Sequence, residues 1–262
     1  MTDSARLSVQ LYSLRSITDP AVKLRVVRAS GLKCVETSSS DHAEARRMRR
    51  LLDENDLAAP SGHYGIEAFR ERLAWVVDTA GILGQQLVVL WGFPENEHWP
   101  ERLGWARAGE ELGRIAERLQ DAGLTFAFHN HDWELRRFQD GRLALDVLFD
   151  TAAGSPLRFQ PDLAWIVRGG KEPRAILDRH ADKVVACHVK DLAPAGDNAD
   201  EDGWADLGQG RITWHELWPA VRAAGASLMV LEHDAPRDPT RFLAVSVAAA
   251  RALALRSREQ LE

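Results

Sequence analysis

Short runs rich in Val, Leu and Ile recur along the whole chain, and each is followed by a longer segment in which apolar residues repeat with helical spacing. Continuous apolar runs are typical of parallel strands buried on both faces, and the longer segments are typical of amphipathic helices. Eight such pairs can be counted. The predicted strands are Leu7–Tyr12, Leu32–Thr37, Leu57–Gly62, Gln86–Trp91, Leu124–Asn130, Leu157–Gln160, Val184–Lys190 and Leu228–Glu232.

The helices between these strands end at recurring glycines. Gly31, Gly84, Gly123, Gly154 and Gly225 each come just after a predicted helix and just before a strand, where a residue with positive φ commonly ends a helix. The predicted helices are Ala21–Ser30, Asp41–Asn55, Ile66–Leu83, Pro100–Ala122, Leu143–Ala153, Pro173–Arg179, Trp214–Ala224 and Pro239–Leu255.

Eight strand–helix units in 262 residues predict an α/β fold, a single (β/α)8 TIM barrel that occupies residues 1–262 as one domain. An open, doubly wound sheet is the alternative. No Gly-x-Gly-x-x-Gly motif follows the first strand, which disfavours a dinucleotide-binding fold. The longest irregular stretch is Ala193–Gly210, after the seventh strand, where a long loop usually serves function.

Composition and charge narrow the class of partner. The chain has 45% hydrophobic and 27% charged residues, which excludes disordered and fibrous proteins. Its net charge of -6 makes nucleic acid an unexpected partner. No apolar run approaches the roughly 18 residues of a membrane span, and no signal-peptide core begins the chain, so we expect a cytoplasmic protein without a membrane partner. Cys34 and Cys187 each lie in an apolar run, which predicts buried thiols without a disulfide.

Polar residues gather at the ends of the predicted strands, which is where barrel active sites lie. Side chains alternate between the two faces of a strand, so His129 and His131 share one face with Ala127, and Phe126 and Phe128 share the other. The phenylalanines are expected to face the helices, which leaves both histidines inside the barrel. The same alternation predicts inward positions for His188, Lys190 and Glu232.

Four strand-end residues on consecutive strands form a candidate metal-ligand set: His129, Asp162, His188 and Glu232. Two imidazoles and two carboxylates suit one Mn²⁺, Co²⁺, Zn²⁺ or Fe²⁺ ion with positions open for substrate oxygens. Without a cation, carboxylates this close would repel each other and take up protons. Whether His129 or His131 is the ligand from the fifth strand stays open, because both face inward.

Other strand-end residues are candidates for substrate binding, and they are Gln10, Glu36, His63, Trp133 and Trp165, with Trp91 as a weaker candidate. Trp133 and Trp165 follow the proposed ligand segments, where an indole can stack on a sugar ring. The segment Gly208-Gln209-Gly210 either presents N–H groups to an anion or forms a turn. Expected at the surface or at helix caps are His42, His98, His180 and His215.

The strand-end segments resemble those of the xylose isomerase-like barrel superfamily, in particular its sugar phosphate isomerase/epimerase branch. The resemblance covers essentially the whole chain. It is most specific in His129-Asn130-His131-Asp132-Trp133-Glu134 and in His188-Val189-Lys190-Asp191. The other matching segments are Val9-Gln10-Leu11-Tyr12-Ser13-Leu14-Arg15, Gly31-Leu32-Lys33-Cys34-Val35-Glu36, Asp162-Leu163-Ala164-Trp165, Leu207-Gly208-Gln209-Gly210 and Leu231-Glu232-His233-Asp234.

The resemblance implies one divalent metal and a sugar, keto-sugar or cyclitol as the small-molecule substrate. Its ligands carry over to His129, Asp162, His188 and Glu232. Many epimerases and isomerases of the superfamily have a glutamate where this chain has His129, so only Glu232 matches their pair of opposed bases. The same segments resemble inosose dehydratases and keto-glycoside lyases, which eliminate across a carbon–carbon bond. Relatives often form dimers or tetramers, which makes a homo-oligomer compatible with the resemblance.

Isomerisation, epimerisation and elimination all begin with removal of a proton next to a carbonyl, and a metal stabilises the enediolate that forms. Glu232 is the leading candidate for the general base, with His131 and Glu134 as alternatives. Lys190 either steadies the developing oxyanion or pairs with Asp191 or Asp162. We therefore expect a metal-dependent sugar isomerase or epimerase, with a dehydratase or lyase as the alternative.

Two further classes share this type of barrel. An abasic-site endonuclease of the superfamily uses three zinc ions and a basic groove, and the four-ligand set and acidic net charge count against it. A non-catalytic sugar-binding barrel would have no need to retain the four-ligand set. Both classes are less favoured than an enzyme acting on a small carbohydrate.

Overall fold

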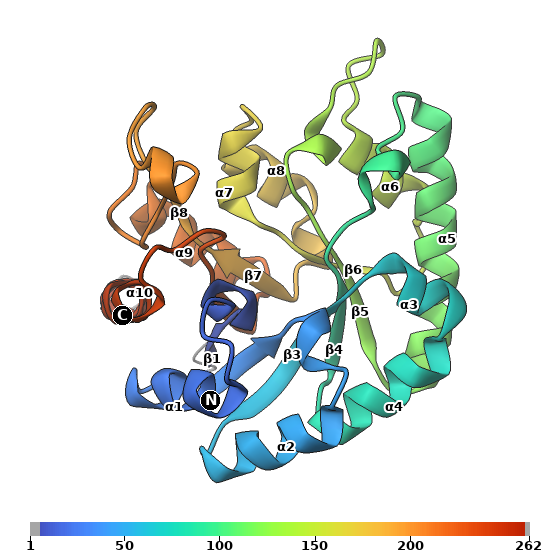
Figure 1. The fold of residues 1–262 in the computed structure, drawn as a ribbon. Coiled ribbons are helices and arrows are strands. Elements are labelled where there is room, and N and C mark those ends of the chain that lie inside the picture. The colour runs from blue at the N-terminus through green and yellow to red at the C-terminus, as the bar shows by residue number, and fades with distance from the viewer. Residues whose placement is uncertain (1–5, 260–262) are drawn as a thin grey trace.

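Eight parallel strands form the wall of a barrel in the computed structural model, which describes residues 6–259 (Figure 1). Each coincides with one of the strands predicted from the sequence. In chain order they are β1 (Arg6–Val9), β2 (Cys34–Thr37), β3 (Ala58–Tyr64), β4 (Leu87–Leu90), β5 (Thr125–His129), β6 (Arg158–Gln160), β7 (Ala186–Val189) and β10 (Leu228–Leu231).

Parallel pairing closes these strands into a ring. One ladder runs β2-β3-β4-β5-β6 and another runs β1-β10-β7. Single parallel bridges join the two ladders, from Gln10 to Glu36 on one side and from Phe159 to Val184 and Asp162 to His188 on the other. The closed ring confirms the predicted barrel and excludes an open, doubly wound sheet.

Helices surround the barrel, and most of them lie where the sequence predicts (Figure 1). They are α1 (Pro20–Ala29), α2 (Ala45–Glu54), α3 (Ile66–Glu71), α4 (Leu73–Leu83), α5 (Arg102–Asp121), α6 (Ala144–Thr151), α7 (Leu163–Arg168), α8 (Pro173–Arg179), α9 (Trp214–Ala223) and α10 (Pro239–Glu259). Among them, none combines the length and the apolar character that crossing a membrane requires.

Two predicted helices differ from the observed ones in ways that shape the barrel mouth. The helix predicted from Asp41 begins only at Ala45, because Ser39–Asp41 forms a separate 3-10 turn, η2. The Asp41 carboxylate closes this turn by accepting a hydrogen bond from the Ser38 N–H at 2.8 Å. The helix predicted over Ile66–Leu83 breaks into α3 and α4 at Arg72, whose backbone (φ -137°, ψ 39°) leaves the helical region.

Helix α7 has no counterpart among the predicted helices, because its six residues are too few to display a helical period. It begins directly after Asp162. The Asp162 carboxylate caps it by accepting a hydrogen bond from the Trp165 N–H at 2.9 Å. This cap helps to hold one of the predicted metal ligands in place.

The barrel interior is apolar where the strands begin and polar where they end. Along β5, Phe126 and Phe128 pack into the core shared with the helices, as the alternation predicts. At the strand starts, a separate apolar cluster fills the barrel, made of Leu87, Ala186, Leu228 and Val230. The cavity described below lies at the other end, where the strands finish.

The segment between β7 and α9 lies at the end of the barrel where the strands finish. It contains a short antiparallel pair, β8 (Asp191–Leu192) and β9 (Trp204–Ala205), within the stretch predicted to be irregular. The Asp191 carboxylate accepts hydrogen bonds from the N–H groups of Leu192, Gly208 and Ile212. A Cβ atom at Gly210 would collide with the same carboxylate. Gly208-Gln209-Gly210 is therefore a turn around Asp191 rather than an anion-binding loop.

Candidate active site

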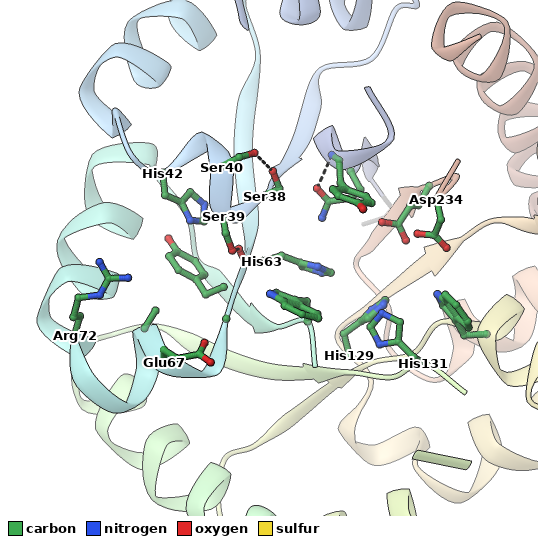
Figure 2. A pocket seen from close by; sticks show the side chains of 18 of the residues that line it. Ser38, Ser39, Ser40, His42, His63, Glu67, Arg72, His129, His131 and Asp234 are labelled. Atoms are coloured by element: carbon green, nitrogen blue, oxygen red, sulfur yellow. Dashed lines mark hydrogen bonds between the residues drawn. The ribbon is translucent and has the colours of Figure 1, made fainter. Parts of the chain in front are cut away.

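A cavity of about 780 Å³ lies at the C-terminal ends of the strands (Figure 2). One part, which we call the cluster lobe, is lined by Gln10, His63, His129, His131, Trp165 and Glu232. The other part, which we call the arm, is lined by Ser38, Ser39, Ser40, His42, Arg72 and Trp75. In Figure 2 the arm lies on the left and the cluster lobe on the right.

The four predicted metal ligands come together, and all are buried: His129, Asp162, His188 and Glu232. Their candidate ligand atoms all lie within 4.8 Å of one another. His129 Nε2 is 3.9 Å from Asp162 Oδ2, and His188 Nδ1 is 4.0 Å from the same oxygen. First-row divalent ions bind N and O at about 2.0–2.2 Å, so the donors around one ion lie roughly 3–4 Å apart. The set therefore matches a single ion.

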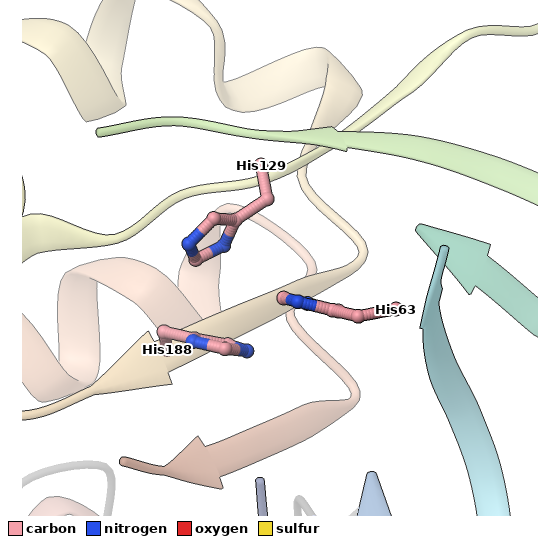
Figure 3. A group of neighbouring side chains, drawn as sticks. All are labelled: His63, His129 and His188. Atoms are coloured by element: carbon pink, nitrogen blue, oxygen red, sulfur yellow. The ribbon is translucent and has the colours of Figure 1, made fainter. Parts of the chain in front are cut away.

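One unpartnered atom in this cluster also fits a metal. Within residues 6–259 Asp162 Oδ2 accepts no hydrogen bond, although it forms an ion pair with Lys190. Burial and the neighbouring His188 lower the pKa of His129, which keeps its imidazole neutral, the form that binds a metal. His63 lies beside the two histidine ligands, with its ring stacked on that of His188 at 4.9 Å between centroids (Figure 3).

Glu36 is predicted to bind substrate, but the structure places it behind His188, and it is not among the residues that line the cavity. His188 Nε2 donates to Glu36 Oε1 at 2.6 Å, and His188 Nδ1 lies 2.7 Å from Glu232 Oε2. Burial by itself would lower the pKa of His188, but the two carboxylates raise it to about 10. A carboxylate on the far nitrogen orients a histidine ligand, and a bound ion would take the place of the proton between His188 Nδ1 and Glu232.

The Glu36 carboxylate is fully engaged by polar side chains from several strands. Besides His188, its oxygens accept hydrogen bonds from Gln10 Nε2 at 3.0 Å and from Gln160 Nε2 at 2.8 Å, and His63 Nε2 lies 3.0 Å away. Gln10 and His63 reach the cavity, so Glu36 links the metal cluster to two candidate substrate contacts.

Lys190 is fully buried and pairs with three carboxylates. Its Nζ lies 3.0 Å from Asp162 Oδ2, 2.7 Å from Glu232 Oε2 and 2.8 Å from Asp234 Oδ2. Burial alone would lower its pKa, but these carboxylates raise it, so the side chain stays an ammonium. The expected pairing with Asp162 is present, and Lys190 is not among the residues lining the cavity. Three carboxylates against one ammonium still leave negative charge for a cation.

The loop after β5 presents His131 to the cavity. Its ring stacks on Trp133 at 4.1 Å between centroids, and its Nδ1 has no hydrogen-bond partner among residues 6–259. Glu134 lies behind it, fully buried, where Oε2 accepts a hydrogen bond from the His131 N–H at 2.8 Å. Burial raises the pKa of Glu134 to about 8. Glu134 is outside the cavity lining, so it can act on the site through His131.

The aromatic candidates Trp91, Trp133 and Trp165 all line the cavity.

The arm is the part of the cavity that the sequence did not predict. His42, expected at the surface or a helix cap, is only 1% exposed and forms part of the arm wall. The run Ser38–Ser40 directly follows a strand end, so the rule that located the cluster could have located it as well.

The fold and the site define a barrel whose strand ends carry a carboxylate–histidine cluster beside a cavity, an arrangement typical of barrel enzymes. The family described as xylose isomerase-like TIM barrel matches residues 24–254. The chain belongs to this family.

Two curated relatives, both named inosose dehydratase, come from Lacticaseibacillus casei and its strain BL23. Each is 22% identical to this chain over 163 residues, which cover 57% of this chain and 52% of the relative. The match therefore spans about half the length of these curated relatives.

Solved structures share the barrel over nearly its whole length. A sugar phosphate isomerase/epimerase from Parabacteroides distasonis has a TM-score of 0.79 at 16% identity, covering 95% of this chain and 94% of its own. The IolI protein with a bound zinc atom has a TM-score of 0.76 at 13% identity, covering 96% of this chain and 99% of its own. At these identities the likeness shows the fold.

Proposed function

We propose that this chain is a divalent-metal-dependent enzyme that isomerises or epimerises a keto-sugar or cyclitol. The observation that carries the proposal is the buried set of His129, Asp162, His188 and Glu232, gathered within 4.8 Å beside a cavity of about 780 Å³. The names of similar proteins support it, since one is a sugar phosphate isomerase/epimerase and another holds zinc.

The four clustered residues would hold the ion. When bound, a divalent ion acts as a Lewis acid that polarises a carbonyl oxygen and so favours loss of the proton on the neighbouring carbon. Glu36 keeps His188 in the orientation that this requires. Lys190 holds Asp162 and Glu232 in place and balances their charge, because it contacts both carboxylates and does not reach the cavity.

His131 best fits the group that takes the proton from the substrate. Its ring lines the cavity, while Trp133 and Glu134 hold its ring and backbone. Glu232, the leading candidate from the sequence, has its Oε2 within 2.7 Å of both His188 and Lys190. We therefore assign ion binding to Glu232, proton transfer to His131 and the positioning of His131 to Glu134.

Elimination of water or of a glycosidic oxygen is the second candidate. Glu232 and Asp234 both line the cavity, and both pair with Lys190. One imidazole that takes a proton and then returns it serves isomerisation and elimination alike. The name inosose dehydratase of the curated relatives supports this second reaction.

Proton exchange in deuterated buffer tests the proposal. Metal-loaded protein is incubated with ketoses, inososes and 3-keto-glycosides, and NMR follows exchange, isomerisation and elimination separately. We expect exchange next to the carbonyl of at least one substrate. His131→Gln should slow it by about 10²–10⁴-fold, the usual contribution of a general base, with the metal content unchanged.

His98→Gln is the matched control, because His98 stacks on the other side of Trp133 at 4.5 Å and does not line the cavity. It should exchange protons at the wild-type rate. No exchange by metal-loaded wild-type protein with any compound of the panel would contradict the proposed function. Unchanged exchange in His131→Gln would contradict the role of this residue alone.

A further inference from the structure

The arm of the cavity is formed by two segments that depart from the regular barrel. One is η2 with the serines before it, directly after β2, and the other is the break between α3 and α4 at Arg72. Neither segment contributes a residue to the metal-ligand set. The arm nevertheless opens into the same cavity as the cluster lobe (Figure 2).

A chain of hydrogen bonds with a fixed direction sets the protonation of His42 at the arm wall. The Tyr64 hydroxyl donates to Gln85 Oε1 at 2.6 Å, and Gln85 Nε2 donates to Thr37 Oγ1 at 2.8 Å. Thr37 Oγ1 lies 2.8 Å from His42 Nε2, and since it already accepts from Gln85 we assign its hydroxyl as the donor to this nitrogen. Burial lowers the pKa of His42 to about 3, so the ring is neutral, and with Nε2 accepting, its proton is assigned to Nδ1.

This Nδ1–H has no hydrogen-bond partner in the described chain, although His42 is only 1% exposed. Leaving a buried donor unpaired costs about 1–3 kcal/mol, so native proteins usually pair such groups. Because His42 lines the arm, a small shift of its ring would let a ligand oxygen placed there supply the missing acceptor.

The serine hydroxyls of the arm present acceptors. Ser38 donates to Asp41 Oδ2 at 2.9 Å, so the Ser40 hydroxyl, 2.9 Å from Ser38 Oγ, is the donor in that pair. Ser39 donates to the backbone carbonyl of His63 at 3.2 Å. With these protons committed, the exposed oxygens of Ser39 and Ser40 offer lone pairs to a ligand.

The charges of the arm are mixed. The Arg72 guanidinium lies 4.7 Å from the centre of the Trp75 ring and forms no ion pair within residues 6–259, while Glu67 also lines the cavity. A phosphate or carboxylate has only acceptor oxygens and would meet serine lone pairs and the Glu67 carboxylate. Hydroxyl groups both donate and accept, so a neutral polyol satisfies all these groups, and an indole suits the apolar face of its ring.

We propose that the arm is a second carbohydrate subsite, which binds a further neutral sugar unit joined to the ring that reacts at the metal cluster. The inference rests on the proposed function and deepens it, because it makes the substrate a two-ring glycoside. The volume agrees: the cavity of about 780 Å³ lies within the roughly 300–1,000 Å³ that encloses drug-sized ligands, which are larger than one hexose.

Calorimetric titration of the metal-loaded protein with unreactive sugars tests the subsite without requiring turnover. The probes are glucose and the disaccharides maltose, cellobiose, laminaribiose and gentiobiose, which differ in linkage. We expect at least one disaccharide to bind about tenfold more tightly than glucose. His42→Phe, which keeps the ring and removes the donor, should reduce this preference by about threefold to tenfold, as the loss of one hydrogen bond predicts.

Arg72→Gln gives a second readout that does not depend on the buried chain of hydrogen bonds to His42, because this side chain is exposed. It should reduce the preference to a similar degree. Arg50→Gln, at an exposed position of α2 outside the cavity, is the matched control and should retain the full preference.

The outcomes separate the two proposals. Binding of glucose with no tighter disaccharide, or a preference that survives both variants, overturns the second subsite and leaves the proposed function standing. Phenyl glucoside binding as tightly as the best disaccharide overturns the assignment of a sugar to the arm. No binding by any of these sugars overturns the second subsite, and the proposed function is then judged by the exchange experiment alone.

Discussion

The two lobes of the cavity are made in different ways. The cluster lobe consists of strand ends, and its charged groups are engaged by other buried groups, as Lys190 is by three carboxylates. The arm consists of segments between strands and offers a neutral imidazole, hydroxyls and an exposed guanidinium. Under the two proposals, the rigid barrel would hold the reactive groups and the connecting segments would select the ligand, a division typical of this fold.

Because its side chains are more deeply buried, the cluster lobe should tolerate substitutions less well than the arm. In the cluster lobe, removing one partner leaves an uncompensated buried charge, which commonly costs about 3–5 kcal/mol. In the arm, truncating an exposed side chain removes about one hydrogen bond, worth roughly 0.5–1.5 kcal/mol. The following predictions test this contrast from the largest expected effect to the smallest.

Replacing His129 is expected to have the largest effect, because it removes a proposed ligand. Wild-type protein should bind about one divalent ion per chain, whereas His129→Ala should lose the ion and His131→Ala should retain it. A ligand at about a hundredfold excess over its Kd stabilises the native state by about 2.7 kcal/mol, so metal should raise the Tm of wild type and of His131→Ala only. Metal retained by His129→Ala and lost by His131→Ala would show that His131 is the ligand from the fifth strand.

Glu36→Gln is expected to have an intermediate effect. The amide removes the charged acceptor from His188 Nε2 while conserving the volume of the side chain. Loss of such an orienting carboxylate typically weakens metal binding by about 10–100-fold, which competition with a chelator would measure. Glu44→Gln, at an exposed position before α2, is the control. Equal metal affinity in the two variants would mean that Glu36 does not orient a ligand.

Thr37→Val is expected to have the smallest effect, and only in the arm. It removes the hydroxyl that directs its proton to His42 Nε2, so the imidazole is no longer held with its proton on Nδ1. The preference for a disaccharide over glucose should fall by about threefold, while metal affinity should not change. A change in metal affinity as large as that of Glu36→Gln would show that the two lobes are not independent.

Much of the cluster lobe could be predicted before the structure. Alternation along β5 separates Phe126 and Phe128 from His129, and the rule that active sites lie at strand ends selects His188 and Glu232. The same reasoning placed Glu36 at the substrate and allowed Glu134 as a base. The structure puts both behind a histidine, since their partners depend on packing between segments distant in sequence.

The sequence by itself determined the eight strands, the face on which each side chain lies and the four residues proposed as metal ligands. These follow from local periodicity, because a strand repeats every two residues whatever surrounds it. Only the tertiary structure decided which polar side chains reach the cavity and which support them, and only it revealed the arm. Glu36 contacts His188 across the barrel, and a helix break and a 3-10 turn bring Arg72 and His42 to the same cavity. These arrangements depend on the closure of the ring and on packing, which leave no periodic pattern in the chain.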